Sequence, residues 1–504
     1  MVINHRIMKN RIGIRRLLVS AVLGINFVSI ASAGLAERVD GIVNQPSQKN
    51  VQYSIIIVKA DSGEVVYSHD ANKAMMPASN MKVITTAAAI KYLGPDYVFK
   101  TEVGLCGDTL VVKGGGDPLL GDAVTDAKYQ REPGWIFKDI AAVLKQNNIT
   151  AIKDIIVDSG IFDSERVNPN WPKEQLNQWY ACEVSGLNFN GNCVAMTVKN
   201  INGGIEIGIE PVTGFLKITN EVKPVQIGKS AVGAYRNLTP NSITLKGKCQ
   251  KQEGPFDVAI EKPAEFFGFL LQENLTRAGI TVNGQVIEKS AFGETSPLGG
   301  PAPGDCDYRK IAEYDMPMID CLARCNKNSF GLAAESLFKT IAAKAAPVGS
   351  TGSPQDGSTM LTTGGKNGSW AAGRELISRY MLELGIERGE FYIDDGSGLS
   401  RENKLSANAI AKVLLDVYKS KNWEVYKNSL ATGGTDGTIR KYFKEEEYKG
   451  KIFGKTGYIN GVKTFSGVCT GRAGDYIFSI LTNKSNGQTR GAINDIAKAV
   501  IDDN

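Results

Sequence analysis

The chain changes character between about residues 100 and 294, and this change sets its domain organisation. Short β-like runs separated by glycine turns fill that stretch, as in the sequence LVVKGGGDP at residues 110–118. Helical spacing of apolar residues then dominates from about residue 305 to residue 420. We therefore expect an inserted, mainly β module, with a return linker around Pro301 to Gly304.

Two β-hairpins are predicted, one on each side of the inserted stretch. The β-rich run at residues 51–59 is followed by a glycine turn and a second run at residues 64–68. Near the C-terminus, residues 451–459 and 462–469 flank an Asn-Gly pair, which is the strongest short hairpin signal. Both ends of the chain therefore contribute antiparallel strands.

A helix is predicted directly after Pro77. Apolar residues recur at helical spacing from residue 81 to residue 92, and the pattern closes at Gly94-Pro95. Ser79 therefore sits at the first turn of a buried helix. Residues 491–501 also have helical periodicity.

The charge balance argues against a nucleic-acid-binding protein. The 504 residues include 58 basic and 53 acidic side chains, for a net charge of +5. This excess is too small and too evenly mixed for a nucleic-acid surface. A mild attraction to anionic polymers of the cell envelope is the most that it supports.

The first 33 residues have the pattern of a signal peptide. Basic residues between positions 9 and 16 precede an apolar run at residues 17–30, which ends in Ala31-Ser32-Ala33. Cleavage is expected after Ala33; the alternative is an uncleaved anchor helix. No later stretch is long and apolar enough to span a bilayer. The mature chain is therefore expected outside the cytoplasm, without a membrane span.

The small number of histidines and the number of cysteines limit the kinds of catalytic and metal site that the chain could form. The chain has only two histidines, His5 and His69, and the first lies in the expected signal peptide. A metal site is therefore not expected, and the base of a hydrolase is expected to be a lysine or a carboxylate. The eight cysteines could pair in an oxidising compartment, but their spacing leaves the pairing open.

The run Ser79-Asn80-Met81-Lys82 places a hydroxyl and an amine on one face of the predicted helix. The helix N-terminus favours developing negative charge, and a buried amine can have its pKa lowered toward working pH, as a general base needs. The alternative is an ordinary N-cap serine. The same spacing recurs at Ser336 and Lys339, but in mid-helix, so we interpret that copy as structural.

Lys455-Thr456-Gly457 lies on the predicted strand before the C-terminal turn. An edge strand can hold an extended peptide through backbone hydrogen bonds, and glycine permits a close approach. Lys455 and Thr456 are suited to binding a substrate carboxylate. A phosphate-binding loop is the alternative, but position 449 is Lys449 where that motif requires glycine.

Taken together, the ordered motifs resemble those of the S13 peptidases, the low-molecular-mass class C penicillin-binding proteins. The likeness covers nearly the whole mature chain and rests on four segments: Pro77-Ala78-Ser79-Asn80-Met81-Lys82, Gly115-Gly116-Asp117-Pro118, Asp395-Gly396-Ser397-Gly398-Leu399-Ser400-Arg401 and Lys455-Thr456-Gly457. The resemblance implies an α/β fold: a transpeptidase/β-lactamase-like domain, with an antiparallel sheet flanked by helices, and inserted β-rich domains. The expected divisions are residues 1–33, 34–100, 101–294 and 295–504, of which the second and fourth form the transpeptidase-like domain.

The resemblance also implies the roles of the site residues. Ser79 is the expected nucleophile, Lys82 assists its deprotonation, and Ser329 relays protons to the leaving group. Lys455, Thr456 and Gly457 bind substrate, and the backbone N–H of Tyr458 pairs with that of Ser79 to bind the oxyanion. No metal or organic cofactor is expected.

Two positions depart from the family pattern. The second motif is Ser-x-Asn, whereas this chain has Ser329-Phe330-Gly331. Gly331 has no side chain to contact substrate or the first-motif lysine. Tyr458 stands where a small hydroxyl residue is usual, so the substrate groove is expected to be reshaped.

Two further features are interpreted as structural. The sequence Asp395-Gly396-Ser397-Gly398 is expected to be a glycine turn that joins elements. The aromatic residues Trp171, Trp179 and Tyr180 are expected to serve core or domain packing.

The function predicted is that of a serine-type D-Ala-D-Ala carboxypeptidase/endopeptidase acting on peptidoglycan stem peptides in the periplasm or cell envelope. β-Lactam antibiotics are the expected covalent inhibitors. One alternative is a catalytically impaired peptidoglycan-binding homologue, because of Gly331. Two others are a β-lactamase or esterase of the same fold and a disulfide-stapled structural protein.

Overall fold

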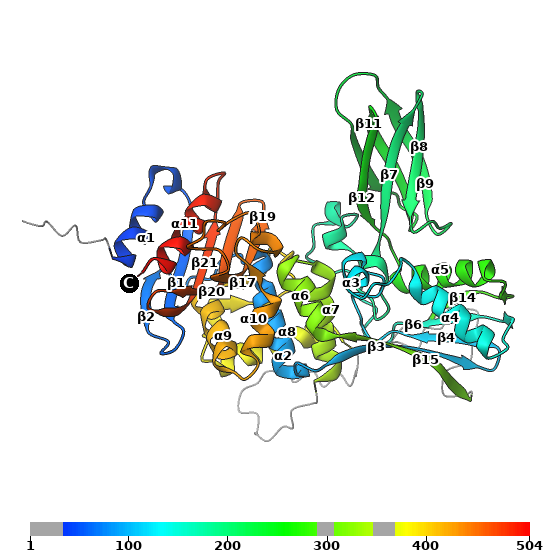
Figure 1. Ribbon diagram of the computed structural model, residues 1–504, viewed down its shortest axis with the longest axis horizontal. Helices are drawn as coiled ribbons and strands as arrows, with labels where there is room; N and C mark the ends of the chain where they lie inside the picture. Colours follow the sequence, from blue (N-terminus) through cyan, green and yellow to red (C-terminus); the bar gives the residue numbers. More distant parts are fainter. Residues whose placement is uncertain (1–33, 290–306, 346–367, 504) are drawn as a thin grey trace, which may run out of the picture.

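The protein has a globular body at each end of its long axis and a β-rich module that stands away from that axis (Figure 1). The structure is a computed structural model that describes residues 34–289, 307–345 and 368–503. The expected signal peptide lies outside the described residues. No helix within the described ranges is long and apolar enough to cross a membrane.

A six-stranded antiparallel sheet combines strands from both ends of the chain. Both predicted hairpins are confirmed, and the sheet order is β18-β19-β20-β21-β1-β2. Apolar side chains of the sheet pack against two terminal helices, α1 (Leu35–Val43) and α11 (Thr489–Ile501). The strands are β1 (Gln52–Lys59), β2 (Val65–His69), β18 (Ala431–Thr432), β19 (Ile452–Ile459), β20 (Val462–Gly471) and β21 (Gly474–Asn483).

A helical layer contacts the same sheet and surrounds α2 (Met81–Leu93). Residues 81–90 of α2 are buried without a polar face, as expected for a helix enclosed by neighbours. The helix ends at Gly94, whose φ of 81° suits glycine, and this confirms the predicted end. The surrounding helices are α6 (Met318–Lys327), α7 (Gly331–Lys344), α8 (Trp370–Glu383), α9 (Ala407–Lys419) and α10 (Trp423–Ser429).

The second body is a five-stranded mixed sheet in the order β14-β6-β4-β3-β15, with helices α4 and α5 packed against β-strand side chains in one core. Its elements are β3 (Val98–Cys106), β4 (Thr109–Lys113), α3 (Ala123–Lys128), α4 (Trp135–Gln146), β6 (Ile155–Asp158), α5 (Pro263–Arg277), β14 (Val286–Lys289) and β15 (Tyr308–Pro317). The expectation that helices follow the return linker directly is wrong at β15, because this strand finds a long antiparallel partner in β3.

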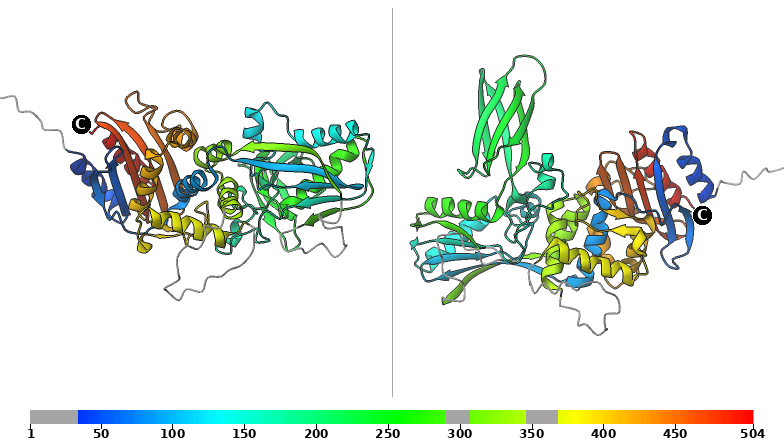
Figure 2. Two further views of the ribbon diagram at one scale, coloured as in Figure 1. Left: turned by 90° about the horizontal axis from the view of Figure 1, so that it is seen from below. Right: turned by 180° about the vertical axis from the view of Figure 1, so that it is seen from behind.

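Two three-stranded sheets form the module that stands away from the bodies (Figure 2). Their orders are β12-β7-β8 and β10-β11-β9. The strands are β7 (Cys193–Ile201), β8 (Gly204–Glu210), β9 (Lys217–Pro224), β10 (Ala231–Arg236), β11 (Ser242–Cys249) and β12 (Gln252–Ala259); four short strands elsewhere are β5 (Ala151–Ile152), β13 (Thr281–Val282), β16 (Phe391–Tyr392) and β17 (Lys404–Leu405). The β-rich character predicted for the inserted stretch is confirmed.

Six cysteines in the described part of the chain are free and buried, whereas Cys106 is disulfide-bonded. Burial raises the pKa of the Cys182 and Cys325 thiols to about 12. Their thiols are therefore protonated at neutral pH and behave as small apolar side chains.

Candidate active site

Ser79 lies in a short 3-10 turn (Ala78–Asn80) that leads into α2, and Lys82 follows in the first turn of that helix. Lys82 Nζ is 3.3 Å from Ser79 Oγ and donates a 2.7 Å hydrogen bond to the Ser397 carbonyl. Only 2% of Lys82 is exposed, and burial lowers its pKa. A buried amine beside the hydroxyl is suited to act as its base.

Strand β19 passes directly against this turn. A Cβ atom at Gly457 would lie 3.0 Å from Ser79 N and 2.9 Å from the Pro77 carbonyl, so glycine permits the approach. The Asn80 amide joins the two elements, because it donates to the Lys455 carbonyl at 2.7 Å and accepts from Ser466 Oγ at 2.6 Å. Sequence reasoning did not assign this role to Asn80.

The second and third motifs meet through their side chains. Lys455 Nζ donates a 2.9 Å hydrogen bond to Ser329 Oγ. Lys455 is fully buried, and desolvation with the nearby charge of Lys82 holds its pKa well below the usual range. Thr456 Oγ1 lies 2.9 Å from Thr438 Oγ1, which places a second hydroxyl beside the third motif.

The glycine of the second motif is explained by the segment that packs on it. Gly331 is the first residue of α7, and a Cβ atom there would lie 2.9 Å from the Tyr180 carbonyl oxygen. Real Cβ atoms essentially never come that close to another heavy atom. An asparagine at position 331 would therefore displace either the first turn of α7 or the backbone at Tyr180.

A cleft of about 420 Å³ joins these residues. It is lined by Ser79, Lys82 and Ser329, and also by Trp179 and Tyr180 of the inserted stretch. Trp171 is buried as expected, and Trp179 and Tyr180 pack edge to face as well as lining the cleft. Tyr458 also lines the cleft and is 68% exposed.

The β19 edge is open along the cleft. Strand β18 pairs with β19 at Phe453 and Gly454, and no other described strand pairs with residues 455–459 on that side. An extended peptide could therefore add to this edge by backbone hydrogen bonds.

The glycine turn around Ser397 is part of the cleft, although we had interpreted it as a joining element. Its Ser397 carbonyl accepts from Lys82, and both Ser397 and Gly398 line the cavity. Glu335 on α7 holds this turn by accepting from the backbone N–H groups of Gly396 (3.0 Å) and Ser397 (2.7 Å). Burial raises the pKa of Glu335 to about 7.

The second Ser-Lys pair has a structural role. Ser336 and Lys339 lie in the middle of α7, and both are fully buried. Lys339 Nζ donates to Asp163 at 2.7 Å rather than to a serine. The interpretation of this pair as structural is confirmed.

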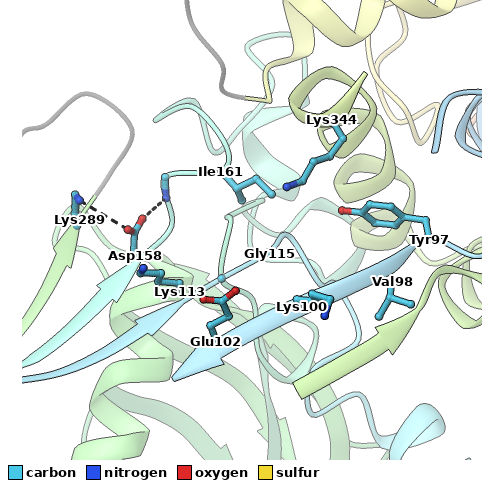
Figure 3. Close-up of a pocket in the computed structure, with 12 residues that line it drawn as sticks. Tyr97, Val98, Lys100, Glu102, Lys113, Gly115, Asp158, Ile161, Lys289 and Lys344 are labelled. Carbon is cyan, nitrogen blue, oxygen red and sulfur yellow. Dashed lines mark hydrogen bonds and ion pairs between the residues drawn. The ribbon is translucent and has the colours of Figure 1, made fainter. Parts of the chain in front are cut away.

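A separate cavity of about 790 Å³ lies beside β3 and the end of α7 (Figure 3). Lysine side chains dominate it, and several are neutralised locally, as Lys289 pairs with Asp158 at 3.9 Å. Among the described residues, it shares no lining residue with the cleft and contains no serine, threonine or cysteine. The candidate chemistry therefore belongs to the cleft at Ser79.

The antiparallel sheet, the buried α2 helix and the cleft between them define a protein of the transpeptidase/β-lactamase-like class. The profile of the D-Ala-D-Ala carboxypeptidase 3 (S13) family matches residues 35–501. The chain belongs to this family of hydrolases, which confirms the resemblance seen in the sequence.

Known proteins and solved structures agree with this membership. The D-alanyl-D-alanine carboxypeptidase of Actinomadura sp. (strain R39) is 26% identical over 487 residues, covering 92% of this chain and 83% of that protein. The D-alanyl-D-alanine carboxypeptidase DacB of Haemophilus influenzae is 22% identical over 456 residues, covering 86% and 85%. The crystal structure of penicillin binding protein 4 (dacB) from H. influenzae matches with a TM-score of 0.73 at 21% identity, over 92% of this chain and 98% of that one. This likeness confirms the fold class.

Proposed function

We propose that the protein is a serine-type carboxypeptidase and endopeptidase that cleaves after D-alanine in peptidoglycan stem peptides. The observation that carries the proposal is the 3.3 Å contact between Ser79 Oγ and the buried Lys82 Nζ, in one cleft with the Lys455–Ser329 pair. Membership of the S13 family supports it. A solved complex of penicillin binding protein 4 from H. influenzae with a β-lactam supports penicillin binding by the same kind of cleft.

The proposed reaction begins with attack by Ser79 Oγ on the carbonyl of the penultimate D-alanine. Neutral Lys82 accepts the serine proton, and the backbone N–H groups of Ser79 and Tyr458 bind the oxyanion. Ser329 passes a proton to the departing amine, while Lys455 and Thr456 hold the substrate carboxylate. Water then releases the acyl group and restores the Ser79 hydroxyl. No step uses a metal or organic cofactor.

The proposed location is the periplasm or cell envelope, where the substrate is found. Export would depend on the signal peptide predicted at residues 1–33. Penicillins and related β-lactams are proposed as covalent inhibitors, since they would acylate Ser79 as the substrate does.

The test is acylation of the mature protein by a fluorescent penicillin, followed by intact mass and peptide mapping. A covalent adduct on Ser79 is expected, together with release of D-alanine from a pentapeptide ending in D-Ala-D-Ala. The Ser79→Ala variant should show neither. Absence of adduct and of D-alanine release in the unaltered protein would favour a second function, a peptidoglycan-binding homologue that has lost catalysis, which Gly331 motivates.

A further inference from the structure

A second, larger cavity adjoins the catalytic cleft. This interdomain groove, of about 880 Å³, lies between the turn that carries Ser329 and the inserted stretch. Its wall includes Asn328 and Phe330 on one side and Ala195 on strand β7 on the other. The groove is about twice the volume of the cleft and falls in the range of ordinary ligand sites.

The groove and the cleft meet at shared and adjacent residues. Trp179 lines both cavities, and the residue is 38% exposed, which is high for so large a side chain. Asn328 and Phe330 line the groove, whereas Ser329 between them lines the cleft. A chain bound in the cleft at Ser329 could therefore continue into the groove around this turn.

The meeting point lies at the leaving-group end of the cleft. The opposite end is marked by Asn460, which follows the last residue of β19, and by Arg401, which donates to the Asn460 carbonyl at 3.1 Å. The leaving-group end is marked by Thr456 and its partner Thr438. The turn before Thr438 packs on the residue that ends α6, two positions before Ser329, since Asp436 pairs with Lys327 at 2.7 Å. Asn328 therefore borders the side from which the amine departs.

The polar lining suits a peptide that bears both kinds of charge. Arg131 lies over the Trp135 ring at 4.2 Å and lines the groove. Its charge acts on the carboxyls of Asp117 and Asp126, but no ion pair within 4.0 Å joins it to a carboxylate of the described chain. The carboxyl group of Asp257 also lines the groove. An arginine that is stacked on an aromatic ring keeps its positive charge, and its guanidinium N–H groups can still donate hydrogen bonds to a carboxylate.

We propose that the interdomain groove binds the departing peptide of a cross-linked peptidoglycan dimer. This inference rests on the proposed function and concerns the endopeptidase substrate. Ser79 Oγ forms an ester with the D-alanine carbonyl as the amide C–N bond to the second peptide breaks. The serine proton reaches the freed amine, which leaves along the groove. Water then hydrolyses the ester to a carboxylate and the serine hydroxyl.

The test uses a substitution that places a bulky side chain in the groove and leaves the residues of the cleft unchanged. Ala195 and Thr197 are both partly buried positions of β7, two residues apart on one face, and only Ala195 lines the groove. The variants Ala195→Trp and Thr197→Trp are therefore matched. For each, kcat and KM are measured with two substrates: a monomeric pentapeptide ending in D-Ala-D-Ala, and a dimer of stem peptides joined through D-alanine.

Ala195→Trp should lower kcat/KM for the dimer at least tenfold, mainly through KM, and change the monomer reaction less than twofold. Thr197→Trp should change neither reaction. Arg131→Gln, a variant that adds no bulk, should likewise raise KM for the dimer alone. The inference would be overturned if a groove variant lowered kcat/KM equally for both substrates. It would also be overturned if Ala195→Trp or Arg131→Gln left kcat/KM for the dimer unchanged. Failure of the unaltered protein to cleave either substrate would instead refute the proposed function.

Discussion

Lys82 can accept a proton from Ser79 only while its amine is neutral. A lysine in water has a pKa of about 10.4 and would be protonated at neutral pH. Burial lowers the pKa of Lys82, whereas the nearby Cys325, Glu335 and Asp395 partly oppose this effect. Lys455 is also fully buried, and desolvation together with repulsion from Lys82 lowers its pKa. Two buried amines in one cleft therefore disfavour simultaneous protonation.

Acylation should therefore rise with pH, with a midpoint below the ordinary lysine value of about 10.4. The sign follows because protonated Lys82 lacks a lone pair for the serine proton, so activity is lost as pH falls through its lowered pKa. The measurement is the second-order rate constant of penicillin acylation from about pH 5 to about pH 10, a range that extends close to the ordinary lysine pKa. Lys82→Arg should be inactive throughout. A midpoint at the ordinary lysine value would contradict the role of burial.

The structure explains why glycine stands at position 331, where the family motif has asparagine. The Tyr180 carbonyl oxygen would lie 2.9 Å from a Cβ at this position, so the inserted stretch occupies the space of the missing side chain. We therefore expect the family's asparagine to be harmful here.

Gly331→Asn should lower kcat/KM for D-alanine release about tenfold, equivalent to about 1.4 kcal/mol of barrier. The reason is that the new side chain displaces either Tyr180 or the first turn of α7, next to Ser329. Gly491→Asn is the matched control, since Gly491 also lies near a helix start and has open space around it. Activity equal to or above that of the unaltered protein would show that the cleft tolerates asparagine.

At the scale of elements, α7 links the second motif to the turn that positions Lys82. Its carboxylate Glu335 accepts from Trp370 Nε1 at 2.8 Å and from two backbone N–H groups of the turn at Gly396 and Ser397. The Ser397 carbonyl in turn accepts from Lys82. Displacement of this carboxylate would therefore be transmitted to Lys82 through the turn at Gly396 and Ser397.

Glu335→Gln should lower both stability and kcat, because a glutamine NH₂ group would face N–H donors in a buried site. The loss of stability should be about 1–3 kcal/mol. Denaturant unfolding and the rate of penicillin acylation provide the two measurements. Ser336→Ala is the matched control one residue away, because its buried hydroxyl has no hydrogen-bond partner among the described residues. If Glu335→Gln kept full activity, the carboxylate would have no positioning role.

Elements with strong local signals could be predicted from the sequence, and those fixed by distant contacts could not. The two hairpins and α2 follow from alternation, an Asn-Gly turn and helical spacing. Strand β15 was missed, because its state depends on pairing with β3, some 200 residues earlier in the chain. The cleft role of Tyr180 was missed for the same reason, since only tertiary packing brings it to Gly331. The predicted domain boundaries stay a prediction.

At the scale of the whole molecule, ion pairs between residues at α3 and residues of α6 join the inserted stretch to the helical layer. Arg324 on α6 makes two hydrogen bonds to Asp122, at 2.9 and 2.7 Å, and both side chains are largely buried. Lys128 and Tyr129 at the end of α3 both donate to Asp320 on α6. Four charged side chains thus join two bodies that meet at the cleft, so the relative placement of the bodies depends on their pairing.

Removing one partner of the buried pair should cost far more than removing the pair. Arg324→Met leaves an unpaired buried carboxylate and should destabilise the protein by about 3 kcal/mol. Adding Asp122→Asn should restore most of this loss, because asparagine carries no charge and can still accept from Thr125 N at the start of α3. Denaturant unfolding measures both variants. Lys91→Met, which breaks the exposed pair with Glu383, is the control and should cost less than about 1 kcal/mol. A single-variant loss no larger than that of the control would mean that the Asp122–Arg324 pair does not hold the two bodies together.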